Sequence, residues 1–140
     1  MNLYEKAKSA QTNSASALEK AGGKAALVQY PLGEAWTVNL SGATISDEVI
    51  DHLKSLTKIG ELNLSKSTLT DAQCAKLGEL KLDTLLVKLD LSHTAVTDAG
   101  LAKLTNSLFL MELNVADTKV TPAGIAAFQQ TRAANPAVKP

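Results

Sequence analysis

Cysteine and aromatic residues are scarce in this chain, and each scarcity excludes something. Cys74 is the single cysteine in 140 residues, so a disulfide within the chain is impossible. Aromatic residues make up 4% of the sequence, which leaves leucine, alanine and other aliphatic side chains to build the core. The length suits one domain that buries about two thirds of the surface of its unfolded chain.

An excess of charge of either sign is also missing, because 14 basic side chains balance 14 acidic ones. The sequence has no basic stripe of the kind that favours nucleic acid. It has no apolar run long enough to span a membrane, and the first thirty residues lack the apolar core of a secretory signal. We therefore predict no nucleic-acid partner and no membrane insertion. Localisation stays open between the cytoplasm and a mature exported form.

The N-terminal part of the chain does not share the pattern found further on. Residues 1–13 carry only a weak helical stripe and are predicted to be flexible or weakly helical. Residues 14–34 are predicted to form a capping helix and strand. Ser16 and Glu19 have the spacing of a capping box at a helix start, and Gly22 is placed to end that helix.

A short strand and a turn complete this N-terminal cap. Residues 24–29 read as a strand through Leu27 and Val28, and residues 30–33, which include Pro31, read as a turn. An atypical first unit is expected in a stack of repeats, because the end of the shared core has to be covered.

Residues 35–133 repeat one pattern four times. The copies begin at Ala35, Ile59, Leu86 and Leu110, and three extra residues fall within 81–85, where they lengthen a loop. Each copy has three apolar strand positions, a further apolar position, and two apolar residues at helical spacing. These positions are Ala35, Val38, Leu40, Ile45, Ile50 and Leu53; Ile59, Leu62, Leu64, Leu69, Cys74 and Leu77; Leu86, Leu89, Leu91, Val96, Leu101 and Leu104; and Leu110, Leu113, Val115, Val120, Ile125 and Phe128.

Each helix is predicted to begin at a hydroxyl residue. Ser46, Thr70, Thr97 and Thr121 stand where an N-cap oxygen is needed. Asp47, Asp71 and Asp98 follow, where a negative charge meets the positive end of the helix dipole. The fourth copy has Pro122 in this slot, a residue that suits the first helical position. This exchange favours a structural role for the aspartates, and Gly100 reads as a small residue tolerated in its first turn.

The repeated pattern LxxLxLxxTxV followed by TDAGL, clearest at residues 86–101, resembles the leucine-rich repeat family. It is most similar to short bacterial repeats and to the cysteine-containing and ribonuclease-inhibitor-like types. The resemblance covers roughly residues 35–128. It implies an α/β fold, a right-handed solenoid of about four β-loop-α repeats, with a parallel sheet on the concave face and helices on the convex face. It also implies a protein partner.

One position departs from the family pattern. Where these repeats often have asparagine, this chain has Ala43, Ser67, Thr94 and Thr118. A hydroxyl can still bond to the loop backbone. Ala43 cannot, so we expect the first loop to differ.

Alternation along the strands predicts which side chains face outward. The candidates for partner binding on that face are Trp36, Thr37, Asn39, Glu61, Asn63, Val87, Lys88, Asp90, His93, Met111, Glu112, Asn114 and Asp117. Exposed apolar anchors among polar residues are typical of interfaces. The alternatives are that these polar residues only keep the sheet solvated, and that Trp36 packs on the N-terminal cap.

Chemical sites are poorly supported. His93 and Asp117 are expected on neighbouring strands, with Asp90 nearby, an arrangement that could hold a metal ion or transfer a proton, but it offers too few ligands. Cys74 falls in an apolar slot and reads as a buried small hydrophobe without a neighbouring base. We therefore predict no metal, no cofactor and no enzymatic activity.

The C-terminal end is expected to be incomplete. The last helix should reach about Ala133, and residues 134–140 form a tail in which 137–139 could begin one more strand. An uncovered last strand would invite pairing. The leading prediction is a non-enzymatic interaction module that binds a protein through its concave sheet. The alternative is an assembly domain that forms a homo-oligomer through this C-terminal end.

Overall fold

Helices and strands alternate along the chain as the repeats predict. The computed structural model describes residues 3–31, 33–56, 59–78, 87–104, 111–130 and 137–139. Within them the elements are α1 (Leu3–Lys20), β1 (Lys24–Tyr30), β2 (Gly33–Asn39), α2 (Asp47–Ser55), β3 (Ile59–Asn63), α3 (Asp71–Gly78), β4 (Lys88–Asp90), α4 (Asp98–Ala102), β5 (Glu112–Asn114), α5 (Pro122–Gln130) and β6 (Ala137–Lys139).

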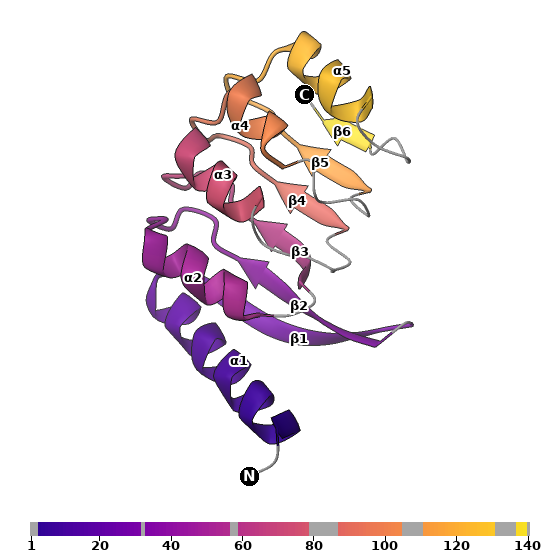
Figure 1. Ribbon diagram of the computed structural model, residues 1–140. Helices are drawn as coiled ribbons and strands as arrows, with labels where there is room; N and C mark the ends of the chain where they lie inside the picture. The colour runs from indigo at the N-terminus through magenta and orange to yellow at the C-terminus, as the bar shows by residue number, and fades with distance from the viewer. Residues whose placement is uncertain are drawn as a thin grey trace.

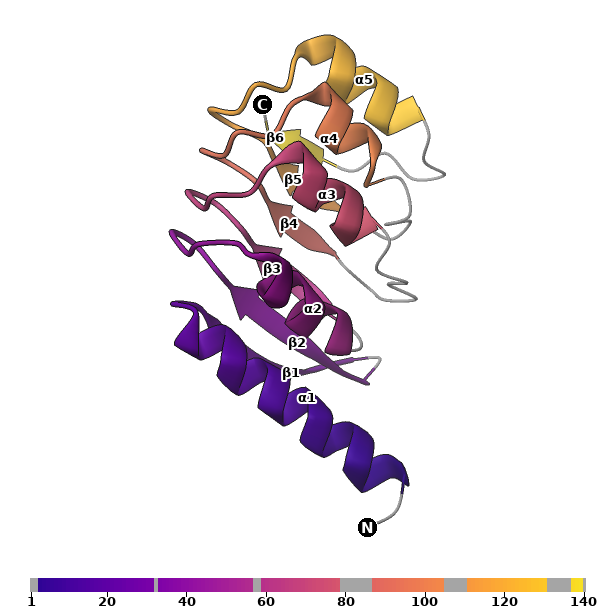
Figure 2. The same ribbon diagram turned by 60° about the vertical axis from the view of Figure 1, so that its left-hand side comes forward.

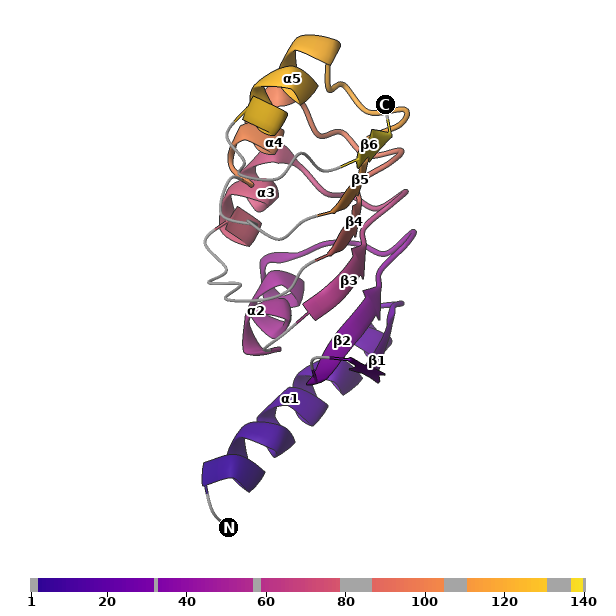
Figure 3. The same ribbon diagram turned by 90° about the vertical axis from the view of Figure 1, so that its right-hand side faces the viewer.

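The strands form one sheet in chain order, β1-β2-β3-β4-β5-β6. Strands β2 to β6 are parallel, whereas β1 pairs with β2 in an antiparallel hairpin. Helices α2 to α5 lie in a row on one side of this sheet, so the repeats form two layers (Figure 1, Figure 3). We call the opposite side of the sheet the open face, because none of these four helices lies on it.

The strand register confirms the alignment of the four copies. Three rows of paired residues cross the parallel part of the sheet. They are Thr37, Glu61, Lys88, Glu112 and Ala137; Val38, Leu62, Leu89, Leu113 and Val138; and Asn39, Asn63, Asp90, Asn114 and Lys139. From β2 to β5 the middle row is buried in the core, and the other two rows therefore face the opposite side.

The N-terminal helix is longer than the sequence predicts. It begins at Leu3, so residues 3–13 are helical and Ser16 lies inside α1 rather than at its start. The predicted capping box at Ser16 is therefore wrong. Helix α1 lies beside α2, at the end of the row that carries β1 (Figure 2). Its buried residues Ala15 and Leu18 belong to the same core cluster as the repeats, which fits the predicted capping role.

The predicted end of this helix is confirmed. Gly22 has a φ of 101°, and its N–H donates to the carbonyl of Glu19. The N–H of Gly23 donates to the carbonyl of Leu18 at 3.1 Å. These two bonds are those of a Schellman motif, which needs a left-handed residue that glycine supplies without side-chain strain.

The expectation that Trp36 lies on the exposed face is wrong. The register between β2 and β3 shifts at this point, so Trp36 lies opposite Ile59 while Thr37 lies opposite Glu61. Trp36 therefore lies on the same side of β2 as Val38, and only 9% of it is exposed within the core cluster. The residue left over at the shift is Gly60 of β3, so alternation from Val38 within β2 is enough to place Trp36 on the core side.

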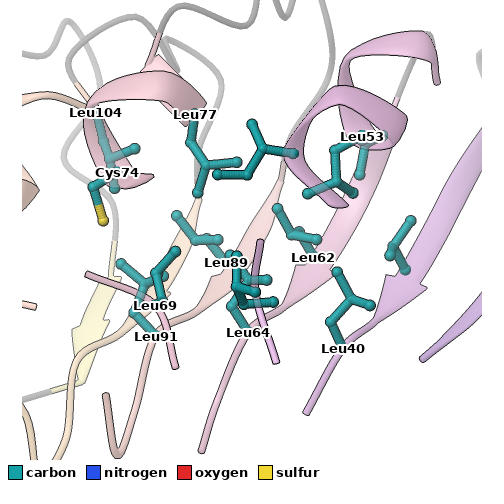
Figure 4. Packing of buried hydrophobic residues seen from close by; sticks show 14 of the residues in the cluster. Leu40, Leu53, Leu62, Leu64, Leu69, Cys74, Leu77, Leu89, Leu91 and Leu104 are labelled. Atoms are coloured by element: carbon teal, nitrogen blue, oxygen red, sulfur yellow. The ribbon is translucent and has the colours of Figure 1, made fainter. Parts of the chain in front are cut away.

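The core is a layer of aliphatic side chains between the sheet and the helices. Figure 4 shows leucines of the strands and helices pointing toward one another, with Cys74 among them. This layer passes from α1 to Phe128 of α5 as one cluster. Where the structure describes them, the positions that the repeat pattern marks as apolar are all buried or pack against this cluster. Ala35 is buried but does not belong to the cluster.

The C-terminal end differs from the expected open edge. Strand β6 pairs in parallel with β5, with Leu113 opposite Val138. The further strand that residues 137–139 could begin is thus formed, and it covers the edge of the fourth copy. The loop insertion at 81–85, the strand starts at Leu86 and Leu110, and the predicted helix end at Ala133 lie outside the described residues.

Candidate interaction surface

One row of the open face carries charged side chains that reach the surface. Glu61 is half-buried, and Lys88 and Glu112 are exposed. The Lys88 ammonium lies 3.7 Å from the Glu112 carboxylate on the neighbouring strand. An exposed ion pair of this kind contributes little to folding stability. A partner could therefore replace either member at small cost.

The row of Asn39, Asn63, Asp90 and Asn114 has a structural role that the sequence did not predict. Each side chain accepts a hydrogen bond from the backbone N–H two residues further on, at 2.9 to 3.0 Å. Asn63 and Asp90 also accept from the hydroxyls of Ser65 and Ser92, both at 2.7 Å. These side chains thus shape the turn after each strand. The Oδ1 atom of each side chain is therefore already engaged.

The turns that follow contain left-handed residues. Lys66, His93 and Asp117 have φ values of 55°, 55° and 54°, and Gly42 occupies the same place in the first turn with 75°. The N–H groups of Lys66 and His93 bond to carbonyls of the next turn, at 2.9 Å each. This repeated geometry projects the three charged or polar side chains along one rim of the sheet.

His93 and Asp117 lie together as predicted, but Asp90 does not join them. The His93 Nε2 atom is 3.4 Å from the Asp117 Oδ2 atom, with both side chains largely exposed. Asp90 Oδ1 instead accepts two bonds from Ser92. Within the described residues there is no group of three histidine, cysteine or acidic side chains that could hold a metal ion.

Exposed apolar side chains near this row are few in the part of the chain that the structure describes. Met111, just before β5, is 54% exposed, and its N–H donates to the carbonyl of Val87 at 2.9 Å. Val87 is half-buried. Each of these residues directly precedes one member of the Lys88–Glu112 pair in the chain, so an exposed apolar side chain adjoins this pair in sequence.

The sequence did not predict the links between neighbouring helices. The carboxylate of Asp71 accepts from the backbone N–H of Thr97 at 2.8 Å and from its hydroxyl at 2.5 Å. Asp98 accepts from the N–H and hydroxyl of Thr121 at 2.7 and 2.5 Å. Each aspartate therefore binds the residue that precedes the next helix, in addition to any effect on its own helix dipole.

Glycine makes room for these links. A Cβ atom at Gly100 would overlap the Asp71 carboxylate, and one at Gly124 would overlap that of Asp98. Gly100 is thus required by a contact from the previous repeat, a stronger reason than the tolerance predicted from its position. The hydrogen bonds from Thr121 hold the pKa of Asp98 below its ordinary value.

The first pair of repeats is joined differently. Gln73 occupies the glycine slot of α3 and forms a capping box with Thr70, at 3.1 and 3.4 Å. Its side-chain amide also donates to the carbonyl of Ile45 at 2.5 Å. Asp47, instead of binding Thr70, lies 2.7 Å from the Lys76 ammonium. An aspartate bond to the threonine that precedes the next helix therefore accompanies glycine in that helix.

The predicted difference in the first loop is confirmed. Ser67, Thr94 and Thr118 each donate a hydroxyl hydrogen bond to the carbonyl three residues earlier, at 2.5 to 2.7 Å. Ala43 has no such group. Thr68 of the second repeat compensates, because its hydroxyl accepts from the N–H of Ile45 at 2.8 Å.

Cys74 is buried in the core cluster, as predicted. Burial, with a smaller effect from the charge of Asp71, raises the pKa of the Cys74 thiol from 9.0 to about 12. The thiol is therefore neutral at physiological pH, and the thiolate needed for nucleophilic chemistry is absent.

These features define a protein of stacked strand–turn–helix repeats with a mixed polar and apolar sheet face. Residues 83–104 match the family model described as leucine rich repeat. This segment of the chain is thus similar to a leucine-rich repeat, as the sequence pattern predicted. Such repeats generally act in protein–protein interaction and are generally non-enzymatic. No curated protein matches the chain.

Among the described helices, none is both long enough and apolar enough to cross a bilayer.

Proposed function

We propose that this chain is a non-enzymatic interaction module that binds a protein partner through the open face of its sheet. The repeats would wind as a right-handed solenoid, because crossovers between neighbouring parallel strands are right-handed in about 98% of cases. The open face is then the concave side.

The observation that carries this proposal is the exposed Met111 beside the Lys88–Glu112 pair. Interface centres combine a large apolar side chain with charged groups that set orientation. His93 and Asp117 extend the charged surface along the rim, and Thr37 and Glu61 extend it toward β2. The Asn and Asp row supports the face by fixing its turns.

Self-association through the C-terminal end remains the alternative function. It would use β6, a strand of three residues between Pro136 and Pro140. Proline and short length both weaken an edge as a pairing site. We therefore favour the open face.

The test is affinity capture from cells that express the protein, with three baits. One is the wild type, one carries Lys88→Glu and Met111→Asp, and one carries Asp51→Lys on the exposed surface of α2. We expect a protein that is recovered with the wild type and the α2 variant and lost with the open-face variant. Recovery of the same proteins by all three baits, or loss only with Asp51→Lys, would contradict the proposal.

A further inference from the structure

Strand β1 forms the N-terminal edge of the sheet, and within the described residues it pairs with β2 alone. Its register with β2 is uninterrupted from Lys24 opposite Asn39 to Tyr30 opposite Gly33. A regular seven-residue edge strand is a template for pairing with another strand. Natural edges are commonly blocked by charge, proline or a bulge, and β1 has none of these between Lys24 and Pro31.

Apolar surface is concentrated on this strand. Leu27 and Val28 are 43% and 38% exposed, and with Met111 they are the exposed large hydrophobic residues of the described structure. Leu27 lies opposite the buried Trp36, on the core side of the sheet. The core is therefore incomplete at Leu27, where a further strand would cover it.

Helix α1 is placed to support such a strand. It continues beyond the level of β1 on the same side of the sheet as the other helices (Figure 3). A strand added beside β1 would therefore have a helix near its core side. This arrangement extends the two layers of the fold past the edge of a single chain.

We propose that β1 pairs in antiparallel fashion with β1 of a second copy of this chain, so that one sheet runs through both copies. Closed twofold pairing is the commonest form of self-association. With the twofold axis at Leu27, Ala26 lies opposite Val28 and Lys24 lies opposite Tyr30. The two Lys24 side chains then lie at opposite ends, about 20 Å apart at the usual rise of a strand. Their repulsion at that separation is screened by salt.

The same charges argue against the other pairing direction. A parallel pair would bring Lys24 beside its symmetry mate, and like charges opposite each other destabilise a sheet. The uncharged centre of β1 therefore matches its own sequence in the antiparallel direction.

Cross-linking of single cysteine variants tests the register. Leu27→Cys places a thiol on the twofold axis, whereas Lys24→Cys places one opposite Tyr30. The native Cys74 is buried and does not interfere. Under mild oxidation we expect a covalent dimer from Leu27→Cys and at least tenfold less from Lys24→Cys. Equal cross-linking of the two variants would overturn the proposal.

Light scattering over a dilution series tests the association itself. We expect a dimer that dissociates on dilution, and a monomer at all concentrations for Val28→Lys, which adds charge to the edge. Ala126→Lys is the matched control, because it adds the same charge on an exposed residue of α5 and should leave the dimer unchanged. Circular dichroism verifies that the variants are folded. Two results would refute the pairing. One is a wild type that stays monomeric at every concentration up to its solubility limit, and the other is a dimer that Val28→Lys does not affect.

Discussion

Replacing Gly100 with alanine should destabilise this protein, although alanine normally stabilises a helix. Relief of glycine's conformational entropy contributes about 0.5–1 kcal/mol in favour of alanine. The added Cβ, however, displaces the Asp71 carboxylate from Thr97. A hydrogen bond to a charged group contributes about 1.5–3 kcal/mol. Because Asp71 is partly exposed, we take about 2 kcal/mol for its two bonds together. The expected net loss is therefore about 1 kcal/mol.

A double-mutant cycle in urea denaturation measures this coupling. In the Asp71→Ala background the carboxylate is gone, and Gly100→Ala should be neutral or stabilise by up to about 1 kcal/mol. The remaining contact is with the Cα of Asp71, 3.2 Å from the added Cβ. Ala99→Gly, on the exposed side of the same helix, is the control and should cost about 0.5–1 kcal/mol. If Gly100→Ala stabilises the wild type, or has one effect in both backgrounds, the link between repeats is not what requires glycine.

Three further predictions follow from single contacts. Thr68→Val should cost about 1–2 kcal/mol, because it leaves the N–H of Ile45 without its acceptor, and Ala43→Ser should recover part of this loss in urea denaturation; no recovery would count against the compensation. Cys74 should resist thiol reagents in the folded state at pH 8 and react on unfolding; rapid labelling of the native protein would contradict its burial. Since its pKa is raised from 9.0 to about 12, the neutral thiol favours the folded state, and stability should fall as the pH rises above 9. The pKa of Asp98 is lowered, so its contribution to folding stability is present above the ordinary value of 3.8 and is lost as the pH falls below it. Asp98→Asn should therefore reduce the difference between the melting temperatures at pH 6 and pH 3. An unchanged difference would show that other groups cause the acid dependence.

Local signals in the sequence were sufficient for much of the fold. The start of each repeat helix could be predicted, because an N-cap such as Ser46 or Thr97 bonds within its own turn. Burial of Cys74 followed from its place in the apolar period. The pairing of His93 with Asp117 followed from aligning the copies, because parallel strands in register bring equivalent residues together.

Features that depend on the neighbouring element were missed. The oxygens of Asp71 bind a residue 26 positions away, so the local reading as a dipole partner was incomplete. Trp36 is an exception, because alternation from the buried Val38 within β2 was enough to place it on the core side. Asn39 and its equivalents were taken for free surface groups, although an asparagine two residues before a turn could have indicated an Asx turn.

The sequence by itself determined the number, order and inward face of the repeats, since the spacing of leucines decides which side of each strand and helix avoids water. Tertiary structure alone decided which polar groups each repeat shares with the next. Whether Asp71 reaches Thr97, or Asp47 instead turns to Lys76, depends on the side chain that the following helix offers at the point of contact. The edge at β1 is likewise a property of the assembled sheet, because only the order of strands leaves Leu27 at its border.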